Sequence, residues 1–346
     1  MLIDEQKYSF MRELLRLRLA KLRWLLLGVV CWLALPAPAQ AWGFFGHRLL
    51  NRLAVYTLPP EMLPFFKANI EYLTTNATRP DSRRTVVPTE APRHFMDVDV
   101  YGDSALTRHG LPRAYADAVA LVGGEDSLLH HGIVPWQVAS MKSKLTAAFQ
   151  AGDTDRILYL AADLGHYVAD ACVPLHTTRN YNGQLTGQRG IHALWESRLP
   201  ELQAADYDLL TGQAPYLEQP TEAAWAAVAR AHTAVDSVFQ MEKLVSGELS
   251  EDRKFSYEQR GNQTIRVYSR EFSLAYHRRL GGQVERQLRY AARLIGAFWY
   301  TAWVDAGQPD LTGLDQHPSV AAQLEAEQES KAASAIPVKA LPGHDE

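Results

Sequence analysis

Two segments of this 346-residue chain each carry a histidine followed four residues later by a carboxylate. The first pair is His166 and Asp170, and the second is His192 and Glu196. On an α-helix this spacing places both side chains on one face, so each pair can direct two ligand groups at one ion. His176 lies between the two pairs. Because neutral imidazole and carboxylate are the ligands of catalytic zinc, the pattern predicts metal sites.

The alternative interpretation is that such pairs are ordinary surface contacts. One His-x-x-x-Asp pair alone is weak evidence of a metal site, but two pairs with a histidine between them are harder to explain in that way. Cys172 falls off the face that carries His166 and Asp170, and we expect it to be a small buried core residue. The remaining histidines do not belong to this run of closely spaced ligand types and are expected at the surface or the edge of the core: His109, His130, His131, His232, His277, His317 and His344.

Residues 1–41 have the layout of a cleavable secretory signal. Five basic residues between Arg12 and Arg23 precede an apolar run from Trp24, and the run is followed by Ala39-Gln40-Ala41. The apolar run is too short to span a bilayer, which disfavours the alternative of a membrane anchor. We therefore expect a secreted or periplasmic protein that has no transmembrane segment after cleavage and begins at Trp42.

The mature chain predicted by this cleavage is acidic and has one cysteine. The whole chain has 35 Lys and Arg against 39 Asp and Glu, and the leader would remove six and three of these, leaving a formal charge of −7. Such a chain offers no basic footprint for duplex nucleic acid. Cys31 would leave with the leader, which excludes an intrachain disulfide. An exported protein without disulfides needs a large core or bound metal for stability.

Apolar residues recur at helical spacing over most of the mature chain, whereas alternating strand patterns are scarce. We expect an all-α fold, with a single multi-helix domain over residues 42–312 and long site loops. The expected loops are residues 74–102 and 177–190, which contain many turn formers. Residues 313–346 are rich in Ala, Glu, Gln and Pro, and we expect a disordered tail. Expected helices include residues 61–72, 135–151, 220–249 and 264–306, the last bent near Gly281-Gly282.

The order of motifs in the mature chain resembles one known superfamily. This superfamily joins zinc-dependent phospholipase C with the zinc-dependent single-strand nucleases of the S-one/P-one type. Its members begin with a tryptophan whose free amino group and carbonyl bind one zinc ion. The match covers the chain from Trp42 to about Glu196. Its motifs are Trp42, His47, Asp81, His94 in His-Phe-Met-Asp, His-Tyr-x-x-Asp at 166–170, Pro-Leu-His at 174–176 and His-x-x-Trp-Glu at 192–196.

The resemblance implies a fold of the phospholipase C and nuclease type and three bound zinc ions. Carried over residue by residue, it implies one zinc held by Asp81, His94, His166 and Asp170, a second by His176, His192 and Glu196, and a third by Trp42, His47 and a bridging Asp170. It also implies catalytic roles for Asp81, Asp170 and Arg84, the last as a basic residue that reaches the phosphate.

These implied ions suit phosphodiester hydrolysis. Zinc ions about 3.5 to 4 Å apart can share a hydroxide with a pKa of about 7 and can clamp the attacking and leaving oxygens around phosphorus. No side-chain nucleophile is then needed. Three dications would also allow an acidic chain to bind phosphate. We therefore expect an exported trizinc phosphodiester hydrolase.

The sequence leaves the substrate open between two classes. The short interval from Trp42 to His47, together with Trp195 and Arg84, favours single-stranded nucleic acid, which is the first expectation. Glu196 in place of Asp and the short interval before His192 favour phospholipid head groups, the alternative. Position 197 is Ser, where the nucleases place Asn to read a base.

Three further expectations follow. A non-catalytic zinc protein is the weaker alternative, because structural sites normally have four ligands and the second site has three. No stable protein partner is expected. A set of basic residues could form a face for a polyanion, but a solvated helix face is the favoured interpretation of Arg278, Arg279, Arg286, Arg289 and Arg293.

Overall fold

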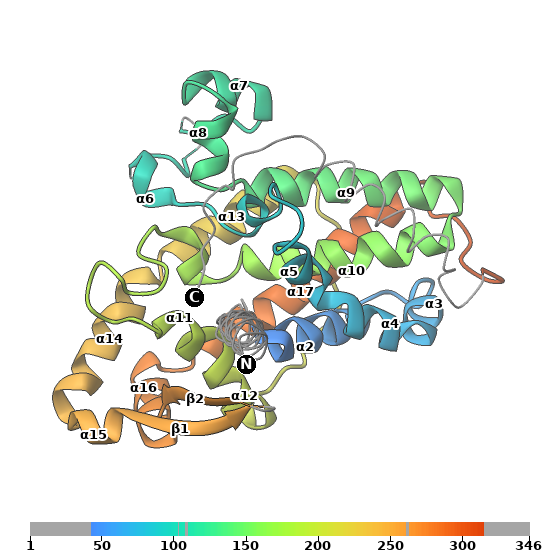
Figure 1. The fold of residues 1–346 in the computed structure, drawn as a ribbon. Helices are drawn as coiled ribbons and strands as arrows, with labels where there is room; N and C mark the ends of the chain where they lie inside the picture. Colours follow the sequence, from blue (N-terminus) through green and yellow to red (C-terminus); the bar gives the residue numbers. More distant parts are fainter. Residues whose placement is uncertain (1–42, 103, 108–109, 261–262, 315–346) are drawn as a thin grey trace, which may run out of the picture. The chain divides into compact units, whose positions relative to one another are not determined.

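The computed structural model describes residues 43–102, 104–107, 110–260 and 263–314. These residues form helices and loops with one small two-stranded sheet, so the expected all-α class is confirmed (Figure 1). All the described elements belong to one compact unit, Ala39–Glu346. The expected leader, Trp42 and the expected tail beyond residue 314 lie outside the described residues. In the described part, no helix has the length and hydropathy needed to cross a membrane.

The first half of the described chain contains α2 (Gly43–Val55), α3 (Leu63–Ala68), α4 (Ile70–Thr75), η1 (Asn76–Thr78), α5 (Arg79–Arg83), η2 (Ala91–His94), α6 (Val98–Tyr101), α7 (Tyr115–Leu121), α8 (Glu125–His130), α9 (Val134–Ala151) and α10 (Thr154–Asp170). The second half contains η3 (Pro174–Thr177), α11 (Ile191–Ala193), η4 (Leu194–Arg198), α12 (Leu199–Gln203), η5 (Ala204–Asp206), α13 (Pro220–His232), α14 (Val235–Glu248), α15 (Glu251–Lys254), β1 (Phe255–Arg260), β2 (Gln263–Tyr268), α16 (Arg270–Leu280) and α17 (Gln283–Asp305).

Four of these helices build the core that supports the candidate site. Helix α10 packs against α9, α17 and α2, and α17 also packs against α2 and α9 (Figure 1). The carboxylate of Asp153 caps α10 by accepting from the backbone N–H of Arg156, which defines where this helix begins. The indole of buried Trp299 donates to the carbonyl of Ala161 at 3.0 Å and so ties α17 to α10.

Two glycines allow α2 to approach its neighbours closely. A Cβ atom at Gly165 of α10 would lie 2.0 Å from Oδ1 of Asn51. One at Gly296 of α17 would lie 3.2 Å from the carbonyl oxygen of Ala54 in α2 and 1.9 Å from Oγ1 of Thr57, just beyond the end of α2. Asn51 uses the close approach, because its amide nitrogen donates to the carbonyl of Ala162 at 3.1 Å. Side chains at either glycine would force the helices apart.

Two expected helices are divided in the structure. Residues 61–72 fall into α3 and α4, which meet at Asn69, and residues 220–249 fall into α13 and α14, separated by Thr233 and Ala234. The expected bend near Gly281-Gly282 is confirmed as a break between α16 and α17, and both glycines have positive φ. Glycine suits this left-handed conformation because it has no Cβ.

The expectation of a helix beginning at residue 264 is wrong. Residues 263–268 form β2, which pairs antiparallel with β1 in a register that places Phe255 opposite Tyr268. Ile265, Val267 and Tyr268 are β-branched or aromatic, and such residues favour a strand when a partner strand is available. The partner precedes β2 in a hairpin, a local pairing that the helical periodicity of the surrounding sequence obscured.

Candidate metal centre

Eight of the nine predicted ligands lie in the described part of the chain, and all eight are buried. They come from six places in the fold: α2, α5, η2, α10, η3 and the α11–η4 turn. The structure brings them into three groups in which the ligand atoms lie within 4.8 Å of one another. These groups are His47, His166 and Asp170; Asp81, His94 and His166; and His176, His192 and Glu196.

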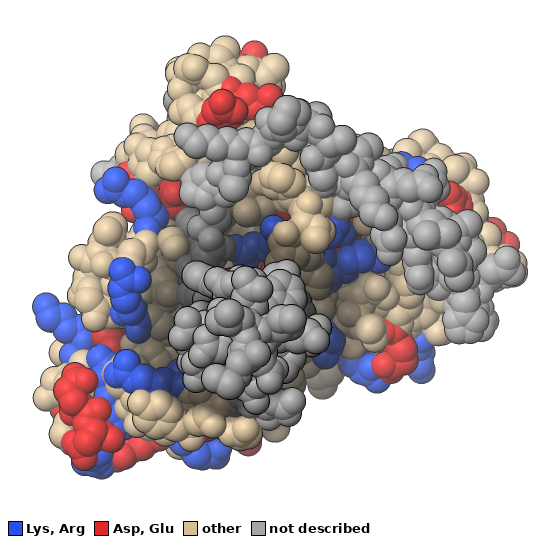
Figure 2. Space-filling model, in the orientation of Figure 1, with Lys and Arg blue, Asp and Glu red and all other residues tan. Residues whose placement is uncertain are grey.

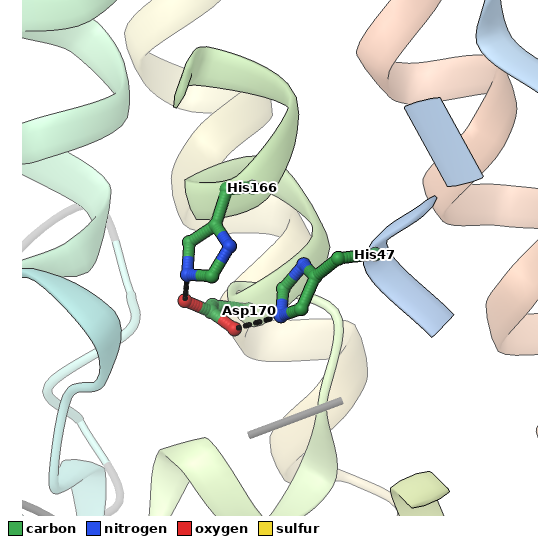
Figure 3. Close-up of side chains that lie close together, drawn as sticks. All are labelled: His47, His166 and Asp170. Carbon is green, nitrogen blue, oxygen red and sulfur yellow. Dashed lines mark ion pairs between the residues drawn. The ribbon is translucent and has the colours of Figure 1, made fainter. Parts of the chain in front are cut away.

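The carboxylate of Asp170 contacts members of all three groups. Its Oδ2 lies 2.9 Å from Nδ1 of His94 and 3.2 Å from Nε2 of His166. Its Oδ1 lies 3.5 Å from Nε2 of His47 and 3.6 Å from Nδ1 of His176. Figure 3 shows Asp170 between His47 and His166, with one oxygen turned toward each ring. A carboxylate whose two oxygens face different histidines is placed as a ligand shared by two metal ions would be.

The ring of His166 lies at the contact between the first two groups. Its Nε2 is 3.6 Å from Oδ1 of Asp81 and 3.0 Å from Nδ1 of His94. The ring of His47 stacks on it with a centroid separation of 3.8 Å. Because His47 comes from α2 and His166 from α10, this stacking depends on the close approach of the two helices at Gly165.

Backbone carbonyls orient two of the imidazole rings. The Nδ1 of His166 lies 2.8 Å from the carbonyl of Ala77, and the Nδ1 of His176 lies 2.6 Å from the carbonyl of His94. A ring that donates through Nδ1 presents a lone pair at Nε2. In both residues Nε2 faces carboxylates of the cluster, since that of His176 is 3.4 Å from Oε2 of Glu196.

The third group is built around Glu196. Its Oε2 lies 3.0 Å from Nε2 of His192, and both residues are fully buried. Glu196 stands in η4, a π-helical turn that follows the short helix α11. Single π-helical turns occur frequently at functional sites, where they redirect side chains.

Several buried polar atoms of the cluster have no hydrogen bond within the described residues. They include both oxygens of Asp81, both oxygens of Glu196, both ring nitrogens of His47, Nε2 of His94 and Oδ1 of Asp170. Buried polar groups of this kind are costly unless a partner satisfies them. The donor set of imidazole and carboxylate fits bound zinc, which would satisfy these atoms.

The charges of the cluster shift the pKa values of its members. Burial is the main cause that lowers the pKa of His47 well below its ordinary 6.5, which keeps this ring neutral. Burial also opposes protonation of His166, yet the carboxylates of Asp170 and Asp81 raise its pKa to about 9. Without metal, the cluster therefore holds a proton on His166. Metal binding requires neutral imidazole and would displace this proton.

Arg84 lies at the border of the cluster and is partly exposed. Burial raises the pKa of Asp81, and positive charges that include Arg84 oppose this rise. Burial lowers the pKa of His192, and the charge of Arg84 lowers it further, against the effect of Glu196. The guanidinium thus acts on residues of two groups, a position compatible with its predicted contact with phosphate.

Three residues that shape the centre, Glu90, Asn51 and Gly165, were not predicted from the sequence. Glu90 is fully buried, and its Oε1 lies 3.6 Å from Nε2 of His94, on the side of the ring away from Asp170. Its separation from His94 is the four-residue spacing that singled out the other pairs, so the signal was present in the sequence. Gly165 and Asn51 act through helix packing, which single-residue chemistry does not reveal.

The other predicted positions in the described part agree with expectation. Cys172 is fully buried, and burial raises the pKa of its thiol. His130 is exposed, whereas His131, His232 and His277 are partly buried. His109, His317 and His344 lie outside the described residues.

No protein-family model matches the chain, and no curated protein matches it in sequence. Among solved structures, the alpha-toxin of Clostridium absonum is 12% identical with a TM-score of 0.42. The alpha-toxin of an avian strain of Clostridium perfringens is 15% identical, also with a TM-score of 0.42. Each match covers 75% of this chain and 65% of the toxin, so this chain spans less than two thirds of either toxin's length.

Proposed function

We propose that this protein is an exported, zinc-dependent phosphodiester hydrolase. The observation that supports the proposal best is the position of Asp170, which contacts members of all three ligand groups. Asp170 would bridge two ions, with His94, His166 and Asp81 on one side and His47 on the other. His176, His192 and Glu196 would hold a third ion. The α-amino group of Trp42 would complete the site that contains His47.

Zinc bound at this cluster would supply an activated water and positive charge for the oxygens around phosphorus. The protein's own residues would position these groups. Asp170 would fix the separation of two ions, and the carbonyls of Ala77 and His94 would hold His166 and His176 with their Nε2 atoms directed inward. Arg84 would bind an oxygen of the substrate phosphate and strengthen the positive field at the border of the cluster.

Among substrates, we propose phospholipid head groups first. Position 197, where the nucleases carry a base-reading Asn, is a buried Ser in contact with Gly43. The last predicted ligand is Glu196 in place of Asp, which also favours phospholipid head groups. Basic and acidic side chains are interspersed around β1, β2 and α15 on the face drawn in Figure 2. Substrates that present one phosphodiester at a time do not need an extended basic face, whereas polynucleotides profit from one.

The basic side chains of α16 and α17 that were considered as a face for a polyanion contact other parts of the protein. Arg279 pairs with Glu248, and Arg289 pairs with Asp208. Arg293 donates to the carbonyl of Gln213 at 3.1 Å. These contacts support the interpretation of this face as structural and solvated. They reduce the basic surface available to a nucleic acid.

Single-stranded nucleic acid remains the second candidate substrate, because Arg84 stands three residues after Asp81, where the nucleases place a basic residue that reaches the phosphate. Two assays separate the candidates. The exported protein is incubated with phosphatidylcholine vesicles and with single-stranded DNA, each with zinc and with a chelator. We expect zinc-dependent release of phosphocholine. Cleavage of DNA alone would favour the nuclease, and zinc binding without hydrolysis of either substrate or of bis(4-nitrophenyl) phosphate would favour the non-catalytic alternative.

A further inference from the structure

A second set of buried charges lies directly behind the ligand cluster. Its centre is Glu90, which is fully buried and comes just before η2. Oε1 of Glu90 lies 3.6 Å from Nε2 of His94. The opposite nitrogen of this ring, Nδ1, lies 2.9 Å from Asp170 and 3.0 Å from His166. The imidazole of His94 is therefore held between an outer carboxylate and the inner cluster.

Three side chains fix the Glu90 carboxylate in this place. Arg93 contacts its Oε2 at 2.9 Å, and Arg83 contacts its Oε1 at 3.3 Å. The hydroxyl of Tyr167, the residue next to His166, also donates to Oε1. Two guanidinium groups stabilise the ionised form of a buried carboxylate and limit its movement.

The same network continues to the segment that carries Asp81. Arg83 contacts Asp163 at 2.8 Å, and Arg79 contacts the same carboxylate at 2.7 Å. Both arginines belong to α5, where they flank Asp81, and Asp163 lies one turn before His166 on α10. The network thus joins the three segments that supply Asp81, His94 and His166.

We propose that Glu90 is a positioning residue that directs Nδ1 of His94 at the metal shared with Asp81 and His166. A carboxylate facing Nε2 favours the tautomer with its proton on Nε2 and the lone pair on Nδ1. It also makes the ring a stronger ligand, as carboxylates behind metal-bound histidines do. This inference rests on the proposed metal centre, but it concerns metal affinity and not the identity of the substrate.

Glu90 could affect the protein in two ways, by orienting His94 or by neutralising the charges of Arg83 and Arg93. Two substitutions separate these effects. Glu90→Asp keeps the negative charge near Arg83 and Arg93 but shortens the side chain by one methylene group, so it withdraws from His94. Glu90→Gln keeps the length but removes the charge. Glu71→Gln is the matched control, because Glu71 is an exposed carboxylate that pairs with Arg52 on the surface.

The experiment measures zinc affinity by competition with a chromophoric chelator, and the thermal midpoint of the metal-free protein. We expect Glu90→Asp to weaken one zinc ion about 10- to 100-fold with a small change in midpoint. Glu90→Gln should lower the midpoint more and weaken the same ion less, since an amide oxygen facing Nε2 also favours the tautomer with its proton on Nε2. The control should match the wild type in both measurements.

The proposal would be overturned if every Glu90 variant that folds bound zinc with wild-type affinity. It would also be overturned if zinc affinity fell only in proportion to the fall in thermal midpoint across the variants. A wild-type protein that binds no zinc would overturn it as well. The outcome is independent of the activity assays. If the wild type binds zinc but hydrolyses no phosphodiester, the proposed function fails, while the role of Glu90 is still decided by the affinities.

Discussion

Gly43 at the start of α2 packs directly against Ser197. A Cβ atom at Gly43 would lie 2.7 Å from Oγ of Ser197, so a larger residue at this contact would require Ser197 to move. Ser197 follows Glu196 in the chain, and His47 lies in the second turn of α2. Helix α2 therefore begins beside the residue that follows one predicted ligand, Glu196, and carries another, His47, in its second turn.

The first prediction concerns the free amino group of Trp42. Protein that begins at Trp42 should bind one more zinc ion than protein with Gly-Ser added before Trp42, and should hydrolyse bis(4-nitrophenyl) phosphate at least about tenfold faster. An amide nitrogen is planar and essentially non-basic, whereas a free α-amino group with a pKa of about 7.7 to 8.0 can bind zinc. Metal analysis and initial rates provide the comparison. Equal zinc content and equal rates in the two proteins would show that Trp42 is not a ligand.

Gly165→Ala tests the close approach of α2 and α10. The added methyl group would meet Oδ1 of Asn51, and we expect a loss of about 1 to 3 kcal/mol in the free energy of unfolding. Zinc affinity should also fall, because His47 stacks on His166 across this contact. Gly247→Ala is the control, since Gly247 lies in α14 with no atom within 4 Å of the added Cβ. Denaturant titrations that give the two variants equal stability would contradict the packing argument.

Asp170 and Glu196 should differ in how many ions they hold. Asp170→Asn should lose both zinc ions that this carboxylate would bridge and should destabilise the protein, because metal binding and folding are coupled. Glu196→Gln should chiefly weaken the ion bound with His176 and His192. Zinc counted per chain after gel filtration distinguishes the two variants. Retention of three ions in Asp170→Asn would refute the bridging assignment.

Asp97 should make the stability of the metal-free protein depend on pH. Burial, reinforced by the charge of Asp99 and opposed by His131, raises the pKa of Asp97 from 3.8 to about 6. A raised folded-state pKa contributes stability below the unfolded value that is lost as pH rises through the folded value. As pH rises from about 4 to 6, the wild type should therefore lose stability that Asp97→Asn does not lose, so the variant should become more stable relative to the wild type. Thermal midpoints across this range test it, and a constant difference between the two proteins would exclude the shift.

Much of the site could be predicted from the sequence, because its ligands come in local patterns. The spacing of His166 and Asp170, and of His192 and Glu196, places each pair in one helical segment, and in the structure the two members of each pair fall in the same group of potential ligands. Asp81 and His94 come from segments without long helices, and only their order in the family resemblance indicated them.

The rest depends on contacts between distant segments. The local sequence does not indicate that Asn51 packs on Gly165, or that Gly43 packs on Ser197. The hairpin after Lys254 was missed because strand pairing is decided by a partner segment, while the residues that follow β2 have helical periodicity. The burial of Glu90 depends on Arg83 and Tyr167, which come from other segments, so its four-residue spacing from His94 does not by itself indicate its place behind the cluster.

The most direct test of the account is a zinc titration of the chelator-treated protein that begins at Trp42, with the hydrolysis of bis(4-nitrophenyl) phosphate followed at each addition. The account predicts no turnover without metal and a rate that rises with bound zinc and levels off when about three ions are bound per chain. Full occupancy by zinc without phosphodiester hydrolysis, or a rate that does not depend on metal, would contradict it.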